Sequence, residues 1–144
     1  MTTWIVVADS SRGKIFVQDQ PNGPLVESED LIHTGARLRE SQLRSDRAGR
    51  EGGAFGQGQS LFDARTEAHA HEAEAFAREI AEHLEAGRTG GKFQHLVLMA
   101  PPAFLGDLRG KLSDGVRRLV VGEVGKDLVT HTAEDVRRHL PHAM

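Results

Sequence analysis

The sequence predicts an α/β fold in which helices pack against a mixed five-stranded sheet. Three observations support this: three strand-like segments open the chain, a long amphipathic helix follows, and two further strand-like segments alternate with helical ones. Consecutive strands joined by short turns favour antiparallel pairing, whereas strands separated by helices favour parallel pairing. The expected element order is therefore β-β-β-α-β-α-β-α, with helices covering the sheet.

The first third of the chain predicts a three-stranded antiparallel meander. Trp4–Ala8 is nearly all apolar, which is typical of a strand buried on both faces. Lys14–Asp19 alternates, with Ile15 and Val17 on one face, as a second strand would. A Pro-Asn-Gly-Pro turn then leads into a third strand over Leu25–His33.

An insert rich in arginine and glycine follows, from about residue 35 to residue 66. Its polar, glycine-rich composition cannot bury enough apolar surface to offset the entropy of ordering its backbone, so we expect a flexible segment. Loops of this length inside a compact domain are commonly either functional or disordered, and both interpretations stay open. The candidate binding residues of the insert are Arg44, Arg47, Arg50, Gly52, Gly53, Gly58 and Gln59.

The clearest predicted helix comes after the insert. Apolar side chains spaced three and four residues apart from Ala73 to Leu84 form one stripe, which indicates a helix packed on the sheet. Thr66 is the expected N-cap and Gly87 the expected end, with a return turn at the following glycine pair.

The last third predicts two strands and two helices. Phe93–Ala100 is a buried strand that Pro101 stops, and Pro102 suits the first turn of the next helix. Leu119–Val124 is the fifth strand. Thr132–Leu140 is the last helix, capped by its threonine.

Length and composition exclude several classes of protein. The 144 residues make one domain, 1–144, that carries the insert. The formal net charge of −3 argues against bulk coating of nucleic acid or an anionic membrane. The chain has no cysteine and no apolar run near the roughly 20 residues of a membrane span. Its first residues lack the pattern of a secretory signal, so we expect a cytoplasmic protein without a membrane role.

Several stretches across nearly the whole chain resemble one bacterial family, the proteins required for attachment to host cells. The matching segments are residues 4–12, 69–77, 100–109 and 125–128. This family is in turn similar to the middle domain of archaeal and eukaryotic peptide-chain release factors. The resemblance implies a ribonuclease H-like sheet, with a Gly-Gly-Gln loop between the third strand and the long helix.

The Gly-Gly-Gln tripeptide of that domain is absent here. Gly52-Gly53 is followed by Ala54, and Gln59 is preceded by Gln57-Gly58. Release chemistry needs backbone without side chains close to the ester, so we do not expect peptidyl-tRNA hydrolysis.

The turn after the first strand holds Asp9, Ser10 and Arg12. A ribonuclease H-like nuclease would place a metal-binding acid at Asp9, but two-metal catalysis needs further acids, and the fourth strand supplies none. We therefore expect Asp9 to accept backbone hydrogen bonds in a turn. Glu79 and His83 share a helix face, yet two ligands do not make a site, so we expect no metal and no cofactor.

Two groups of basic residues are candidates for contact with nucleic acid. One is the arginine-bearing insert, and the other is a secondary patch around the second helix: Arg109, Lys111, Arg117 and Arg118. The alternative for both is solubilising surface. The favoured function is a non-enzymatic cytoplasmic protein that acts by binding an unknown protein partner. The alternative is a ribosome- or RNA-associated factor, and the sequence predicts no oligomeric state.

Overall fold

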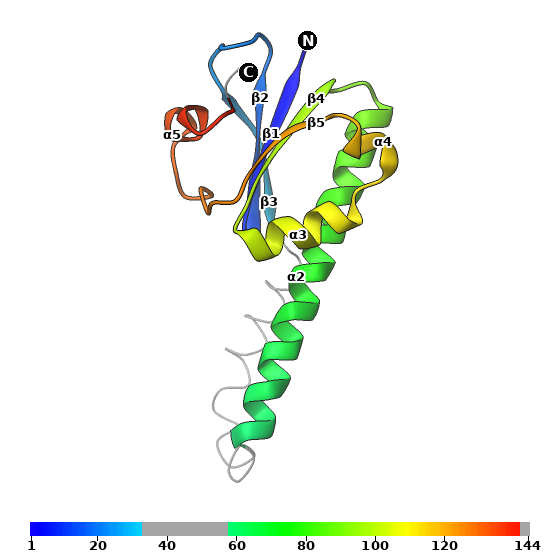
Figure 1. The fold of residues 1–144 in the computed structure, drawn as a ribbon, viewed down its shortest axis with the longest axis vertical. Helices are drawn as coiled ribbons and strands as arrows, with labels where there is room; N and C mark the ends of the chain where they lie inside the picture. The colour runs from blue at the N-terminus through cyan, green and yellow to red at the C-terminus, as the bar shows by residue number, and fades with distance from the viewer. Residues whose placement is uncertain (33–57, 142–144) are drawn as a thin grey trace.

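The structure is a computed structural model that describes residues 1–32 and 58–141, without the side chains of residues 58–69. Five strands form one sheet in the order β3-β2-β1-β4-β5, and helices lie on it (Figure 1). The strands are β1 (Thr3–Ala8), β2 (Arg12–Gln18), β3 (Val26–Ile32), β4 (His95–Met99) and β5 (Val120–Val124). The helices are α2 (Gly58–Thr89), α3 (Pro102–Lys111), α4 (Asp114–Arg117) and α5 (Ala133–Arg138).

The sheet is mixed, as the sequence predicts. β1 pairs antiparallel with β2, and β2 pairs antiparallel with β3. On its other side β1 pairs parallel with β4, which pairs parallel with β5. Trp4 of β1 thus lies between Val17 of β2 and Leu96 of β4. The α/β class and the five-stranded sheet are confirmed, while the narrower ribonuclease H-like assignment stays a prediction.

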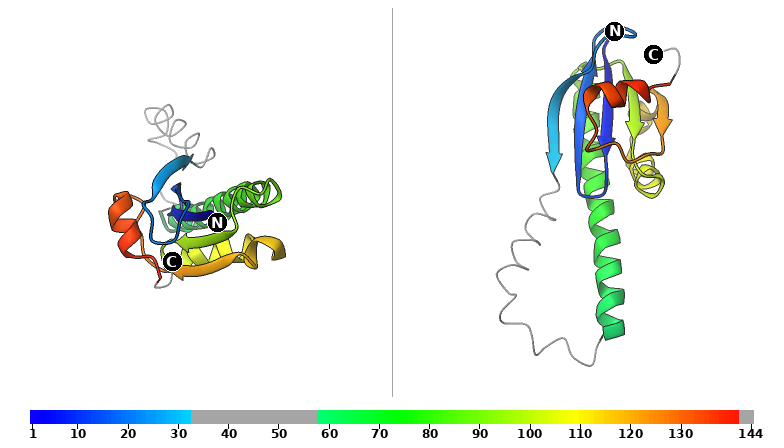
Figure 2. Two further views of the ribbon diagram at one scale, coloured as in Figure 1. Left: turned by 90° about the horizontal axis from the view of Figure 1, so that it is seen from above. Right: turned by 90° about the vertical axis from the view of Figure 1, so that its left-hand side faces the viewer.

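One face of the sheet is covered by α2 and α3. Trp4, Val6 and Ala8 of β1 point to this face and are buried against the apolar stripe of α2. Phe76 on that stripe stacks with Phe104 of α3, their ring centroids 5.9 Å apart. The N-terminal part of α2 continues well past the sheet (Figures 1 and 2).

The opposite face of the sheet is covered by α5 and the segment that precedes it. Ile5 and Val7, the intervening residues of β1, pack there with Leu128, Val129 and Val136. All six residues of β1 are buried because helices or loops lie on both of its faces. The result is a three-layer arrangement with β1 at its centre.

Two predictions about α2 are wrong. Thr66 does not cap the helix, which begins at Gly58, because the residues between them include no proline and mostly favour helix. Gly87 does not end it either, since the helix runs to Thr89 and the turn follows, where Gly91 has a φ of +68°. Thr132 does cap α5, as predicted, by accepting a hydrogen bond from the Asp135 N–H.

Most of the predicted insert lies outside the described residues: Arg44, Arg47, Arg50, Gly52 and Gly53. Gly58 and Gln59 are the first two residues of α2, so the end of the predicted insert belongs to this helix. The short helix α4 has no counterpart in the predicted elements. Ser113 caps it by accepting a hydrogen bond from the Val116 N–H.

Candidate functional site

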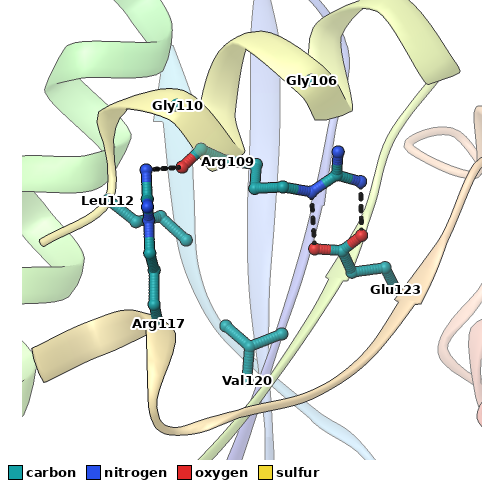
Figure 3. Close-up of a pocket in the computed structure, with 7 residues that line it drawn as sticks. All are labelled: Gly106, Arg109, Gly110, Leu112, Arg117, Val120 and Glu123. Carbon is teal, nitrogen blue, oxygen red and sulfur yellow. Dashed lines mark hydrogen bonds and ion pairs between the residues drawn. The ribbon is translucent and has the colours of Figure 1, made fainter. Parts of the chain in front are cut away.

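A pocket of about 420 Å³ lies between α3, α4 and β5 (Figure 3). Its volume is within the usual range of small-molecule sites. The walls come from one helix face, the end of a short helix and one edge strand. The lining residues are Gly106, Arg109, Gly110, Leu112, Arg117, Val120 and Glu123.

Helix α3 presents its polar face to this pocket because its apolar face is committed to the core. Leu105 and Leu108 are buried against α2 and the sheet. Residues one helical step away, Gly106, Arg109 and Gly110, are exposed and line the pocket. The spacing of buried leucines thus fixes which side of α3 is available to a ligand.

A β-bulge in β5 brings Val120 and Glu123 to the same side of the sheet. Regular alternation would send these two residues to opposite faces. However, Leu96 pairs with Val120 while the next residue of β4, Val97, pairs with Gly122, so Val121 is an extra residue in β5. Bulges of this kind redirect side chains and are common beside functional sites. Here the bulge supplies both an apolar and an acidic pocket residue.

Arg109 and Glu123 form a two-point ion pair at the pocket wall (Figure 3). Arg109 Nε donates to Glu123 Oε2 at 3.0 Å, and Nη2 donates to Oε1. These hydrogen bonds to Glu123 raise the pKa of Arg109 above its ordinary value. The arginine side chain is 53% exposed, so water screens the pair and a competing anion can reach it.

Arg117 is the second cation of the pocket. Its Nη2 donates to the backbone oxygen of Arg109 at 3.0 Å, which holds the guanidinium beside α3. Within the part of the chain that the structure describes, Arg117 contacts no carboxylate, in contrast to Arg109. Figure 3 shows Arg117 and the Arg109–Glu123 pair on either side of Val120. The pocket therefore has two positive charges and one negative charge around an apolar floor.

Gly106 and Gly110 leave the face of α3 open. A Cβ atom at either position would meet nothing within 4 Å. Glycine inside a helix costs roughly 0.5–1 kcal/mol relative to alanine, and packing does not require it at these positions. The two glycines therefore leave space in the pocket that folding alone does not require.

The structure brings together only part of the predicted basic patch. Arg109 and Arg117 line one pocket, whereas Lys111 and Arg118 do not. Sequence reasoning missed Glu123, Gly106, Gly110, Leu112 and Val120 as site residues. Gly106 and Gly110 could have pointed to the pocket from the sequence, because glycine is unfavourable inside a helix. The place of Glu123 depends on the β5 bulge, which no local pattern marked.

The turn after β1 has the bonding expected of an aspartate turn. Asp9 Oδ1 accepts the backbone N–H groups of Ser11 and Arg12, both at 2.9 Å. Ser10 is half-buried within this turn. Arg12 and Lys14 border a second pocket of about 410 Å³, but each has its own carboxylate, Asp9 at 3.8 Å and Glu27 at 3.9 Å.

Among the described residues, 1–32 and 58–141, no group of three or more histidine, aspartate or glutamate side chains could hold a metal ion. His83, one of the pair considered above, instead lies against Glu29 of β3 and stacks on Trp4, with ring centroids 6.0 Å apart. Within those ranges, none of the helices has the length and apolar character that crossing a bilayer demands.

Comparison with known proteins gives a family and one relative of interest. An uncharacterized protein of Rickettsia prowazekii is 36% identical over 81 residues, which cover 55% of this chain. The matched region spans about half of that relative, 54% of its length. The family model described as "Protein required for attachment to host cells" matches residues 4–140. That match includes the whole α3–β5 pocket and every strand and helix described above except the first residue of β1, so the chain belongs to the family of proteins required for attachment to host cells.

Proposed function

We propose that this protein acts by binding an anionic partner in the α3–β5 pocket, without catalysis. The observation that carries the proposal is that Arg109 and Arg117, from two different elements, line the same open pocket. Arginine keeps its proton at any physiological pH, so it can hold an anion but cannot act as a general base. Glu123 is engaged by Arg109, which also favours binding over proton transfer.

The family description supports a role in attachment, and we extend it to this chain as part of the proposal. We place the protein in the cytoplasm as part of the same proposal. Attachment would then depend on the partner that the pocket binds, rather than on direct contact between this protein and a host surface.

The test is complementation of a deletion strain in an adherence assay. The deletion should lower adherence, and the wild-type gene should restore it. The double variant Arg109→Ala/Arg117→Ala should not restore it at equal protein level. Arg138→Ala is the matched control, because Arg138 is an exposed arginine on α5, which covers the other face of the sheet. Full complementation by the double variant would refute the role of the pocket.

A second candidate function is association with RNA or the ribosome, as in release and rescue factors, without peptidyl-tRNA hydrolysis. The observation that favours it is the exposure of Arg117 and Arg118 side by side, where neither contacts a carboxylate of the described residues. Phosphate contacts release counterions, so such binding weakens steeply with salt.

Sucrose-gradient sedimentation of lysate tests this candidate. The protein should travel with ribosomal subunits at low salt and leave them at high salt. The variant Arg117→Ala/Arg118→Ala should sediment slowly at both salt concentrations, and a second variant that replaces Arg44, Arg47 and Arg50 tests the insert separately. Slow sedimentation of the wild-type protein at low salt would exclude ribosome association.

A further inference from the structure

We propose that the α3–β5 pocket binds a phosphomonoester of a sugar that carries a flat base, the chemistry of a mononucleotide, and that Glu123 occupies the anion position until this ligand displaces it. The inference deepens the proposed function, on which it rests, by naming the ligand and the residue that competes with it. Two sources share this chemistry: a free mononucleotide and the terminal phosphate-bearing nucleotide of an RNA chain.

The charges of the pocket favour a phosphate over a carboxylate. Arg109 and Arg117 carry two positive charges, of which Glu123 neutralises one. A phosphate dianion that takes the place of Glu123 on Arg109 carries a second negative charge, which Arg117 on the other side of the pocket can balance, whereas a carboxylate carries only one. The planar fork of arginine also matches the oxygens of a phosphate in a two-point contact.

The position of Glu123 makes it a competitor rather than a permanent partner. Its carboxylate meets Arg109 with the same two-point geometry that a phosphate would use. The pair is accessible to solvent, with 53% of the arginine side chain and 29% of the glutamate side chain exposed. Exposed ion pairs contribute little to folding, so exchange of one anion for another costs the protein little stability.

The rest of the pocket suits a flat, partly apolar group. Leu112 and Val120 provide apolar contact surface, and Val120 lies between the two arginines in Figure 3. Gly106 and Gly110 have no side chain, so a ring can lie close to the backbone of α3. A guanidinium plane can also stack on a ring. Phosphate without a ring would leave this surface unused.

Calorimetric titration of the purified full-length protein tests the ligand class. Adenosine monophosphate is the probe, with adenosine, inorganic phosphate and glycerol phosphate as comparisons. The nucleotide should bind at least tenfold more tightly than any of the three. A short RNA with a 5′-phosphate, titrated beside the same RNA with a 5′-hydroxyl, distinguishes the RNA source from the free nucleotide. If neither phosphorylated probe binds more tightly than its unphosphorylated counterpart, the inference is wrong.

Three variants test the residues. Arg117→Ala should weaken nucleotide binding on the order of tenfold, as expected for loss of a charged hydrogen bond. Glu123→Gln should strengthen binding several-fold, since it removes the competing charge and keeps the shape of the side chain. Arg138→Ala should bind as the wild type does. Unchanged or weaker binding by Glu123→Gln would overturn the competitor role, and its circular dichroism spectrum shows whether it is folded.

These outcomes are separable from those of the proposed function. If the double arginine variant loses adherence but no nucleotide binds, the pocket binds another anion, and only the inference fails. If nucleotide binds with the expected effects of the variants while adherence is unchanged, the inference holds and the attachment role fails.

Discussion

Gly87 of α2 lies directly against the indole ring of Trp4. A Cβ atom at Gly87 would come within 2.8 Å of Trp4 Cη2 and 2.9 Å of Cζ3, closer than packed carbon atoms approach. The ring cannot yield easily, because Trp4 is 5% exposed and contacts Phe93, with ring centroids 4.7 Å apart, and Phe93 Cε1 would itself lie 3.1 Å from the added Cβ atom. The glycine that the sequence suggested as a helix end is therefore a packing residue.

Gly87→Ala should lower the free energy of unfolding. The clash with Trp4 costs about 1–3 kcal/mol, as overpacking of a core does, which exceeds the helix-propensity gain of about 1 kcal/mol. Urea denaturation measures the change. A variant as stable as the wild type would mean that the indole moves aside at no cost.

Gly110→Ala should have the opposite effect on stability. A Cβ atom there meets no atom within 4 Å, so the helix-propensity gain of about 0.5–1 kcal/mol is not offset by a clash. The same denaturation experiment measures it, beside Gly87→Ala as the contrasting glycine. We also expect this variant to bind ligand more weakly, since the new methyl group enters the pocket. If Gly110→Ala is less stable than the wild type, the space beside Gly110 on α3 is not open.

Thr132→Ala should cost about 1 kcal/mol of unfolding free energy through loss of the α5 N-cap. The threonine side chain accepts from the Asp135 N–H at 3.2 Å, and the helix it begins holds the fully buried Val136. Thr132→Ser keeps the hydroxyl and should stay near wild-type stability. Equal losses in the two variants would point to the lost methyl group instead of the cap.

Stability should fall as the pH drops below the ordinary carboxyl range, in part through Glu85. Hydrogen bonds from Arg88 and from Ser113 lower the pKa of Glu85 below its ordinary value of 4.5. A carboxyl whose pKa is lower in the folded state stabilises that state above pH 4.5, and the contribution is lost as the pH falls through the folded pKa. Glu85→Gln should therefore show a flatter dependence of unfolding free energy on acid pH. If the unfolding free energies of the wild type and of Glu85→Gln depend on acid pH in the same way, Glu85 does not have this role.

The sequence predicted the sheet well because strand signals are local. The buried run at Trp4–Ala8 and the alternation that follows it depend on neighbouring residues alone. The start of α2 was harder, since glycine and arginine content suggested a loop where helix-favouring residues already continue from Gly58. The composition of a segment and its helix propensity gave opposite indications there.

The pocket could be predicted only in part. Arg109 and Arg117 were recognised as cations, yet their place in one pocket depends on how α4 turns the chain back, so that Arg117 bonds to the backbone oxygen of Arg109. Glu123 depends on the parallel register of β4 and β5 and on the bulge at Val121. Register between strands that a helix separates is set by three-dimensional packing, which no single segment encodes.

The central position of β1 has a consequence for synthesis of the chain. Its parallel partner is far away in sequence: the Thr2 N–H donates to the Gln94 side chain, 92 residues later, at the point where β1 meets β4. A nascent chain can form the β1–β2–β3 meander early, but one edge of β1 stays unpaired until β4 leaves the ribosome. Until then, the unpaired edge of this apolar strand is open to aggregation or to capture by a chaperone.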